Sequence, residues 1–206
     1  MATKSDLPII LLAAGSSSRM RGKDKLLEDV GGVPLLRRQA DVARAATSGP
    51  VIVALPPEPH ARYAVLDQSQ VIPTPIENAH KGLSESLKGA LDVLPPDTPA
   101  TMLLLADLPD LTVRDLRTVF DAVRPDSDRV IWRGTTEDGA PGHPIVVSAA
   151  LFDALQATTG DTGGNAVMKE NRHRTEFVTL PGQNALRDLD TPEDWAVWRS
   201  DQSSNP

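Results

Sequence analysis

Short aliphatic runs alternate with amphipathic stretches along most of the chain. Residues 8–14 (PIILLAA) are continuously apolar and end at Gly15, a pattern typical of a strand buried on both faces. Residues 34–46 carry apolar side chains at helical spacing and stop before Ser48, which predicts a helix. The same criteria predict further strands over 51–55, 70–73, 101–106, 129–133, 143–148 and 174–180. They predict further helices over 58–66, 84–93, 111–123, 149–157 and 191–199, the last capped by Thr191.

The alternation of strands and helices along the chain predicts an α/β fold with three layers and a mostly parallel sheet. In such sheets, ligands gather beyond the carboxyl ends of the strands, so the loops at those ends are the first places to look for a site. The length of 206 residues suits one domain, and we therefore expect residues 1–206 to form a single domain with a frayed tail from Asp201 onward.

Charge and composition limit the partners and metal ligands that the chain can have. The formal net charge of −7 would repel nucleic acid and anionic membranes, so neither is an expected partner. No apolar run approaches the length of a membrane span and residues 1–7 are polar, which leads us to expect a cytoplasmic protein. Because the chain has no cysteine, a bound metal would need oxygen or nitrogen ligands, and magnesium fits that requirement.

The loop after the first strand has the composition of a polyphosphate site. Small residues from Ala13 to Ser18 are followed by four cations, Arg19, Arg21, Lys23 and Lys25. Free backbone N–H groups, hydroxyls and cations together suit a polyphosphate, which needs several donors at once. A solvated turn with a charged rim explains the same composition equally well. The loop matches neither the Walker pattern nor the dinucleotide-binding glycine pattern.

Two acidic segments, with three aspartates between them, have the placement of metal ligands. Asp107 follows the aliphatic strand at 101–106, where a carboxyl-end ligand belongs, although an aspartate before Pro109 is also a common turn residue. Asp188 and Asp190 share one face of an extended segment, because side chains on a strand repeat every two residues. They could hold one cation together, or they could simply cap the helix that begins near Thr191.

Taken together, these motifs resemble the MobA-like molybdenum-cofactor nucleotidyltransferases, and specifically their molybdopterin cytidylyltransferase branch. The family pattern LAAGxSSRMG..K is matched by residues 12–25, LLADxP by 104–109 and D[IL]DTPED by 188–194. Residues 78–91, the GHP at 142–144 and the GDTG at 160–163 resemble three further family stretches. The resemblance covers nearly the whole chain. Two positions depart from it: Arg21 is inserted between Met20 and Gly22, and Gly164-Asn165 replaces an Ala-Arg pair.

The resemblance implies a Rossmann-like nucleotidyltransferase fold and a role for each matched residue. The catalytic set would be Arg19, Lys25 and Asp107, and the metal ligands would be Asp107 and Asp190 with help from Asp188. The nucleotide site would comprise Leu12, Ala13, Ala14, Gly15, Ser16, Ser17, Arg19, Lys25, Asn78, Gly82, Ser84, Ser86 and Asp107. Gly142, His143, Pro144 and Asp161 would bind the acceptor.

The implied reaction moves CMP from CTP to the phosphate of a molybdopterin-type pterin, with Mg²⁺ as cofactor and Mn²⁺ as the alternative ion. Ala13-Ala14-Gly15 resembles the cytidylyltransferase form, whereas guanylyltransferases of the group more often carry Ala-Gly-Gly. The alternatives are a GTP-dependent guanylyltransferase and a nucleotide-binding chaperone without turnover. Asp107 and Asp190 disfavour the chaperone, because binding alone does not require both metal ligands. Partners beyond the substrates would be the recipient molybdoenzyme or its chaperone.

Overall fold

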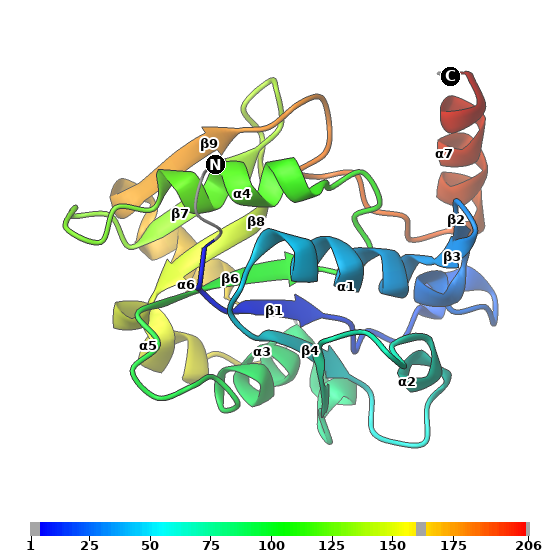
Figure 1. The fold of residues 1–206 in the computed structure, drawn as a ribbon, viewed down its shortest axis with the longest axis horizontal. Coiled ribbons are helices and arrows are strands. Elements are labelled where there is room, and N and C mark those ends of the chain that lie inside the picture. Colours follow the sequence, from blue (N-terminus) through cyan, green and yellow to red (C-terminus); the bar gives the residue numbers. More distant parts are fainter. Residues whose placement is uncertain (1–4, 160–163, 205–206) are drawn as a thin grey trace.

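A seven-stranded sheet organises the chain, for which the computed structural model describes residues 5–159 and 164–204. Its strand order is β5-β4-β1-β6-β8-β7-β9. The strands are β1 (Ile9–Leu12), β4 (Val51–Leu55), β5 (Ile72–Pro75), β6 (Ala100–Leu105), β7 (Ile131–Thr135), β8 (Pro141–Ser148) and β9 (Thr175–Thr179). The helices are α1 (Leu35–Ala46), α2 (Ala61–Val65), α3 (Leu83–Leu91), α4 (Val113–Ala122), α5 (Phe152–Gln156), α6 (Asn165–Glu170) and α7 (Pro192–Ser204). Figure 1 shows how they surround the sheet.

Six of the strands run in one direction and β8 runs against them. β1 pairs in parallel with β4 and β6, β4 with β5, and β7 with β9, while β8 is antiparallel to both β6 and β7. The reversal follows from the sequence, because only five residues join β7 to β8 and such a short link permits a hairpin but no parallel crossover. As a result, the first residues of β8 lie at the same edge of the sheet as the last residues of β6.

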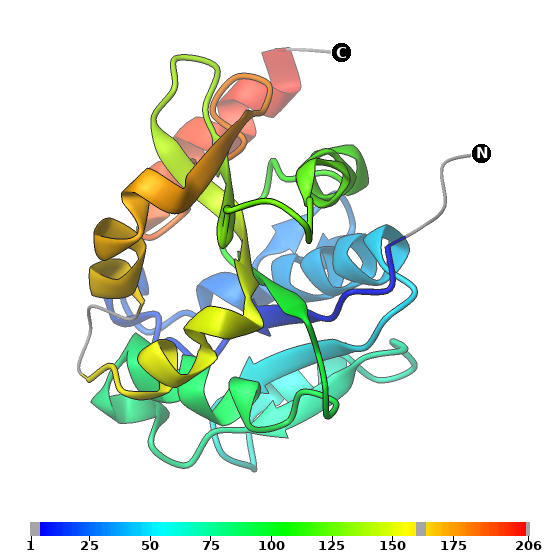
Figure 2. The same ribbon diagram turned by 90° about the vertical axis from the view of Figure 1, so that its left-hand side faces the viewer.

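Helices cover both faces of this sheet, as the three-layer prediction required (Figures 1 and 2). Alternate residues of β1 enter two separate cores: Ile9 and Leu11 pack on one side, and Ile10 and Leu12 on the other. The first core includes apolar residues of α1, α4 and α7, and the second includes residues of α3, α5 and α6. Because both faces are covered, the central strands are apolar without interruption, which explains the continuous aliphatic runs in the sequence.

The predicted elements are observed with shifts at their ends, and four features differ. The sequence patterns missed a two-stranded hairpin, β2 (Asp29–Val30) with β3 (Val33–Pro34), and the short helix α6. The expected helix over 149–157 is a 3₁₀ turn (Ala149–Leu151) followed by α5. Helix α7 continues to Ser204, beyond the predicted helix end at 199. No helix in the described part of the chain is long and apolar enough to cross a membrane.

Candidate active site

The end of β1 and the start of α3 enclose a cavity of about 460 Å³ at the carboxyl edge of the sheet. On the β1 side it is lined by Ala14, Gly15 and Ser16, three of the residues expected to bind nucleotide. The backbone reaches this position because Ala13 N donates to Ala54 O at 2.9 Å, which extends the β1–β4 pairing past Leu12. The opposite wall is made by Pro56, Pro57, Glu77, Ala79, His80, Gly82, Leu83 and Ser86.

Residues of the predicted 78–86 loop have different positions around this cavity. Gly82 and Ser86 line it, whereas Asn78 faces a neighbouring cavity of about 330 Å³. Ser84 is fully buried in the first turn of α3. Gly82 has a φ of 118°, a conformation that disfavours any side chain, and this turn directs the chain into α3. Of the four residues predicted for this loop, Gly82 and Ser86 therefore face the cavity.

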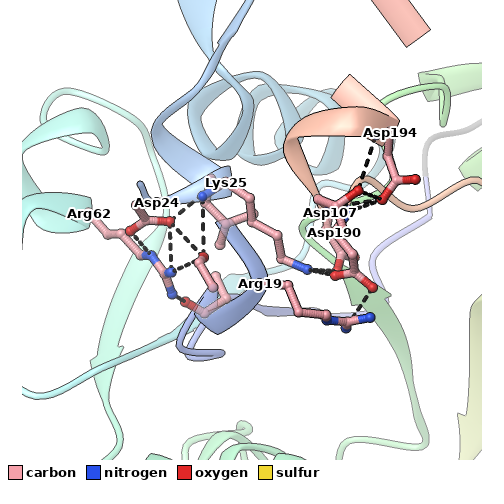
Figure 3. A network of polar contacts seen from close by, with 11 residues as sticks. Arg19, Asp24, Lys25, Arg62, Asp107, Asp190 and Asp194 are labelled. Carbon is pink, nitrogen blue, oxygen red and sulfur yellow. Dashed lines mark hydrogen bonds and ion pairs between the residues drawn. The ribbon is translucent and has the colours of Figure 1, made fainter. Parts of the chain in front are cut away.

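A buried network that the sequence analysis missed holds the first loop in place. Arg62 of α2 is only 1% exposed, and its Nε and Nη2 donate to the two carboxylate oxygens of Asp24 at 2.7 and 2.8 Å. Its Nη1 donates to Ala13 O at 2.6 Å, so the guanidinium also holds the end of β1. Figure 3 shows the pairing of Arg62 with Asp24. A buried arginine with a bidentate carboxylate partner fixes geometry strongly. No sequence signal pointed to Arg62, whereas Asp24 lies next to the matched lysine.

Ser17 belongs to the same network. It has a φ of 52°, an unfavourable conformation for serine, and its hydroxyl accepts from Lys25 N and from Arg62 Nη2, both at 3.2 Å. The hydroxyl donates to Asp24 Oδ1 at 3.1 Å. Ser17 was expected to contact nucleotide, but its hydroxyl is used to close the loop. Burial raises the pKa of Asp24, yet the bonds and charge of Arg62 outweigh this effect and hold that pKa below its usual value.

The centre of the site is an ammonium held between two carboxylates. Lys25 Nζ lies 2.5 Å from Asp107 Oδ2 and 2.6 Å from Asp190 Oδ1, and the side chains of all three are largely buried (Figure 3). Arg19 approaches Asp190 from the solvent side at 2.7 Å. The backbone brings the two acidic segments together, because Leu189 N donates to Asp107 O at 3.3 Å. Positions 25, 107 and 190, which are distant in sequence, therefore lie together in the structure.

Asp188 completes a group of three carboxylates with Asp107 and Asp190. One oxygen from each lies within 4.8 Å of the others, close enough to share a cation. The alternative capping role is not what the structure shows for Asp190: Thr191 and Asp194 form the helix cap, with Asp194 N donating to Thr191 Oγ1 at 3.2 Å. The side chain of Asp190 is bound by Lys25 and Arg19.

This group has the properties of a divalent-metal site. Asp107 Oδ1 is buried and has no hydrogen-bond partner among residues 5–159 and 164–204, which is costly for a carboxylate oxygen unless a ligand satisfies it. Three carboxylates suit Mg²⁺ or Mn²⁺, both of which prefer oxygen ligands. The residues present therefore fit a divalent cation, with the orphaned oxygen of Asp107 as the sign that a partner is missing.

The titratable groups of this cluster differ in the direction of their pKa shifts. Burial lowers the pKa of Lys25, but the charges and hydrogen bonds of Asp107 and Asp190 outweigh it and raise that pKa above its usual value. Burial raises the pKa of Asp190, but the bonds and charge of Lys25 bring it below the usual range. Partial desolvation and the negative charges of Asp190 and Asp107 raise the pKa of Asp188. Lys25 is thus firmly cationic and Asp190 firmly anionic, while Asp188 is the residue that most lacks a positive neighbour.

Three of the four residues expected to bind the acceptor lie at the start of β8. Gly142 packs so closely on the backbone of Ala185 that an added Cβ would lie 2.0 Å from Ala185 O, and His143 N donates to the same oxygen at 2.8 Å. Burial, with a contribution from the charge of Arg133, lowers the pKa of His143 to about 3, so its ring is neutral. Pro144 is buried in the strand. Asp161 lies outside the described residues.

A larger cavity of about 810 Å³ lies elsewhere, between the β2–β3 hairpin and α7. Two of its arginines are already paired with carboxylates: Arg187 with Asp110 and Asp201, and Arg199 with Glu28. A third arginine of that cavity, Arg38, has a buried Nε without a hydrogen-bond partner among the described residues. The smaller cavity is the better candidate because Ala14, Gly15 and Leu83 line both it and a pocket of about 90 Å³ that also includes Lys25 and Asp107.

Comparison with known proteins gives consistent results. The sequence profile of the MobA-like NTP transferase domain matches residues 9–175. A probable molybdenum cofactor guanylyltransferase from Trichormus variabilis is 32% identical over 98% of this chain and 96% of its own. The molybdenum cofactor cytidylyltransferase of Escherichia coli is 28% identical over 93% of this chain and 94% of its own. The crystal structure of Rv0371c from Mycobacterium tuberculosis in complex with manganese has 25% identity and a TM-score of 0.74, covering 94% of this chain and 97% of its own.

The matched profile begins at β1 and includes the first loop, Lys25 and Asp107. The relatives extend over almost the full chain and carry names of nucleotidyltransferases with two different nucleotides. The names of these two relatives share the class of reaction and differ in the base. The chain therefore belongs to the MobA-like NTP transferase family and is a nucleotidyltransferase.

Proposed function

We propose that this protein transfers CMP from CTP to the phosphate of a molybdopterin-type cofactor, using Mg²⁺ held by Asp107 and Asp190. The observation that supports the reaction most directly is the contact of Lys25 with both carboxylates beside a cavity of nucleotide size. Relatives named molybdenum cofactor cytidylyltransferase and guanylyltransferase support the acceptor class. Recipient molybdoenzymes or their chaperones would take the product.

The reaction we propose is an in-line displacement at phosphorus. A phosphate oxygen of the acceptor forms a bond to the α-phosphorus of CTP, the bond from that phosphorus to the bridging oxygen of the β-phosphate breaks, and pyrophosphate leaves with the electron pair. The attacking phosphate is already anionic, so no protein side chain must remove a proton. The task of the protein is to position two anions and to reduce the repulsion between them.

Each charged residue has a part in that task. Lys25 is rigidly placed by the loop network and raised in pKa, so it presents a constant positive charge to the triphosphate. Arg19 is mostly exposed and can turn from Asp190 toward the outer phosphates. Asp107, Asp190 and the helper Asp188 would hold the metal ion, which when bound supplies further charge neutralisation.

The choice of CTP rests on the turn at the end of β1. Ala13-Ala14-Gly15 places the methyl group of Ala14 on the wall of the nucleotide cavity. A pyrimidine is smaller than a purine, and this methyl group leaves less room for guanine. GTP is the second candidate, because relatives of both names match the chain at similar identity.

A direct assay tests the proposal. Purified protein is incubated with MgCl₂, molybdopterin and CTP, GTP, ATP or UTP in parallel, and both pyrophosphate and the dinucleotide product are measured. We expect turnover with CTP above all others, loss of turnover in Asp107→Asn, and unchanged circular dichroism in that variant. Asp121→Asn, an exposed change on α4, is the matched control and should leave the rate unchanged. Preference for GTP would reject the cytidylyl assignment, and no product with any nucleotide would reject the acceptor class.

A further inference from the structure

The two outermost strands of the sheet differ in how open their edges are. β5 forms one edge and β9 the other, so each pairs with a single neighbouring strand in the described part of the chain (Figure 1). The outward backbone groups of an edge strand can pair with another chain, and proteins commonly prevent this with proline or charge. A comparison of the two edges therefore shows where the fold prevents such pairing and where it permits it.

Prolines block the edge at β5. Ile76 N donates to Leu55 O at 2.9 Å, and this bond sets the alternation along the strand. Residues at even positions direct their backbone groups to β4, whereas those at odd positions direct them outward. The outward positions of β5 include Pro73 and Pro75, which have no N–H to donate. A further strand could not form a regular ladder with this edge.

The edge at β9 has no such protection. Leu180 N donates to Thr135 O at 2.9 Å, so residues at even positions of β9 direct their backbone groups to β7. Phe177 and Thr179, at odd positions, direct theirs outward, and both residues are exposed. The strand has the sequence TEFVT, which is free of proline and rich in residues that favour an extended backbone. Its outward donors and acceptors are therefore available to another strand.

The α6 side of this edge is apolar at its centre and positively charged around it. Phe177 is 40% exposed, although aromatic residues are only 3% of the chain. Arg172 lies over its ring, with 5.0 Å between Cζ and the ring centroid. Arg133 and Lys169 line a cavity of about 140 Å³ together with these two residues. Across residues 5–159 and 164–204, none of the three cations forms a salt bridge with a carboxylate.

The segment that leads into β9 is basic in a chain that is acidic overall. Residues 169–174 (KENRHR) contain three cations and one carboxylate, that of Glu170, whereas the formal net charge of the chain is −7. Such a local reversal of charge favours an acidic partner, because complementary charge directs and orients association. A second copy of this chain would bring a second KENRHR segment to the interface and would add positive charge instead of offsetting it. Charge therefore favours a different, acidic protein over self-association.

We propose that the free edge of β9 binds an extended acidic segment of a partner protein, which adds one further strand to the sheet. Backbone hydrogen bonds to Phe177 and Thr179 supply affinity, and side chains at alternate positions of the partner supply specificity. On the α6 side, the partner places an apolar residue against Phe177 and acidic residues two positions away, within the field of Arg172 and Lys169. This contact between proteins does not depend on the proposed reaction.

A peptide titration tests the edge. The peptide TETVTET places one valine between two glutamates on the same face of a strand, and TKTVTKT is its matched control with reversed charge. Each peptide is titrated into the ¹⁵N-labelled protein while ¹H–¹⁵N spectra record the backbone amides. We expect TETVTET to shift the amides of Phe177 and Thr179 and to slow their exchange with solvent, with the amide of Ile72 at the opposite edge unmoved. TKTVTKT should bind about fivefold more weakly or worse.

Two substitutions of Thr179 separate strand pairing from other effects. Thr179→Pro removes the outward N–H, whereas Thr179→Val keeps both the N–H and the β-branched shape. The affinity for TETVTET should fall about fivefold in the first variant, as expected for one lost hydrogen bond, and stay within about twofold of wild type in the second. Arg172→Gln changes an exposed side chain and should weaken the binding of TETVTET but not of TKTVTKT. It keeps the proposal testable if Thr179→Pro fails to fold.

Each contrary result has a defined meaning. Unmoved amides of Phe177 and Thr179 would overturn the proposal. Equal affinity for the two peptides would mean that the edge pairs without regard to charge, which overturns the acidic partner. Concentration-dependent shifts of the same amides without peptide, together with a dimer mass in light scattering, would assign the edge to a second copy and overturn it likewise. Shifts confined to Arg172 would indicate a charge contact without an added strand, which also contradicts the proposal.

Discussion

Replacing Arg62 by methionine should destabilise the protein by about 3–5 kcal/mol, although Arg62 touches no substrate in the proposed reaction. The guanidinium is 1% exposed and donates to both oxygens of Asp24 and to Ala13 O. Methionine fills a similar volume but leaves the partly buried carboxylate of Asp24 without its cation. Removing one partner of a buried ion pair typically costs this much, because the remaining charge stays desolvated.

Three further variants distinguish this explanation from a simple packing defect. Asp24→Asn should partly rescue Arg62→Met, so the double variant should be more stable than the sum of the two losses predicts, by about 1 kcal/mol or more. Arg37→Met breaks the solvent-exposed contacts of Arg37 with Asp41 on α1 and with Asp67 O, and should cost less than about 1 kcal/mol. Urea unfolding at fixed pH gives all four free energies. If Arg62→Met costs no more than Arg37→Met, the buried pair is not what holds the loop.

The same substitution should reduce catalysis beyond its effect on stability. Ser17 keeps its unfavourable φ of 52° through bonds to Asp24, Lys25 and Arg62. Without Arg62 the loop can relax and Lys25 loses its fixed position. A displacement near 1 Å at a charge-stabilising group can cost about 10²-fold in rate. Single-turnover rates at a temperature where the variant is fully folded measure this loss separately.

Other predictions concern the site itself. Lys25→Ala should lower kcat/KM by about 10²-fold, a loss of about 3 kcal/mol. Lys23→Ala should have little effect, because Lys23 is exposed and pairs only loosely with Glu28. The reverse ranking would assign the triphosphate contact to Lys23 instead of Lys25. Ala14→Gly should raise GTP use more than it lowers CTP use, which shifts the preference between the two nucleotides by about 1–3 kcal/mol. An unchanged preference in competition assays would mean that Ala14 does not select the base. His143 should contribute to acid sensitivity, because its folded pKa of about 3 lies below the unfolded value near 6.5. The unfolded state therefore binds the proton first, and stability is lost as pH falls through this window; wild type should lose about 1 kcal/mol more than His143→Gln between pH 6.5 and 5.5 in urea titrations. Parallel curves for the two proteins would mean that the ring is not shielded.

Hydrophobic periodicity was sufficient to predict the layers of the fold, because a strand that is buried on both faces has a continuous run of apolar residues. Residues 8–14 could only be a central strand, and β1 is paired on both sides. The β2–β3 hairpin has no such apolar run, because each of its strands has only two residues. Helix α6 was missed for a similar reason: with six residues it shows less than two turns of periodicity.

Residues of the candidate site could be proposed from the sequence where a residue type and a strand end coincide, but not where a contact crosses between elements. Asp107 and Lys25 follow from motifs, and the structure brings them within 2.5 Å. Arg62 gave no signal because an arginine in a short helix looks like a surface residue, and only the fold shows that it is buried. Ser17 matched its motif, but its hydroxyl serves the loop rather than facing the cavity. Local sequence thus specifies which groups are available, while tertiary contacts decide their use.

The reversed strand β8 divides the sheet into two parts. The parallel strands β5, β4, β1 and β6 lie on the side of the candidate nucleotide cavity, while β8 carries Gly142, His143 and Pro144, the residues expected to contact the acceptor. Within the sheet, the ladder between β6 and β8 joins the two parts. Under the proposed function, a chimera that exchanges residues 131–179 between relatives should therefore take its acceptor from the donor of that segment and its nucleotide from the rest.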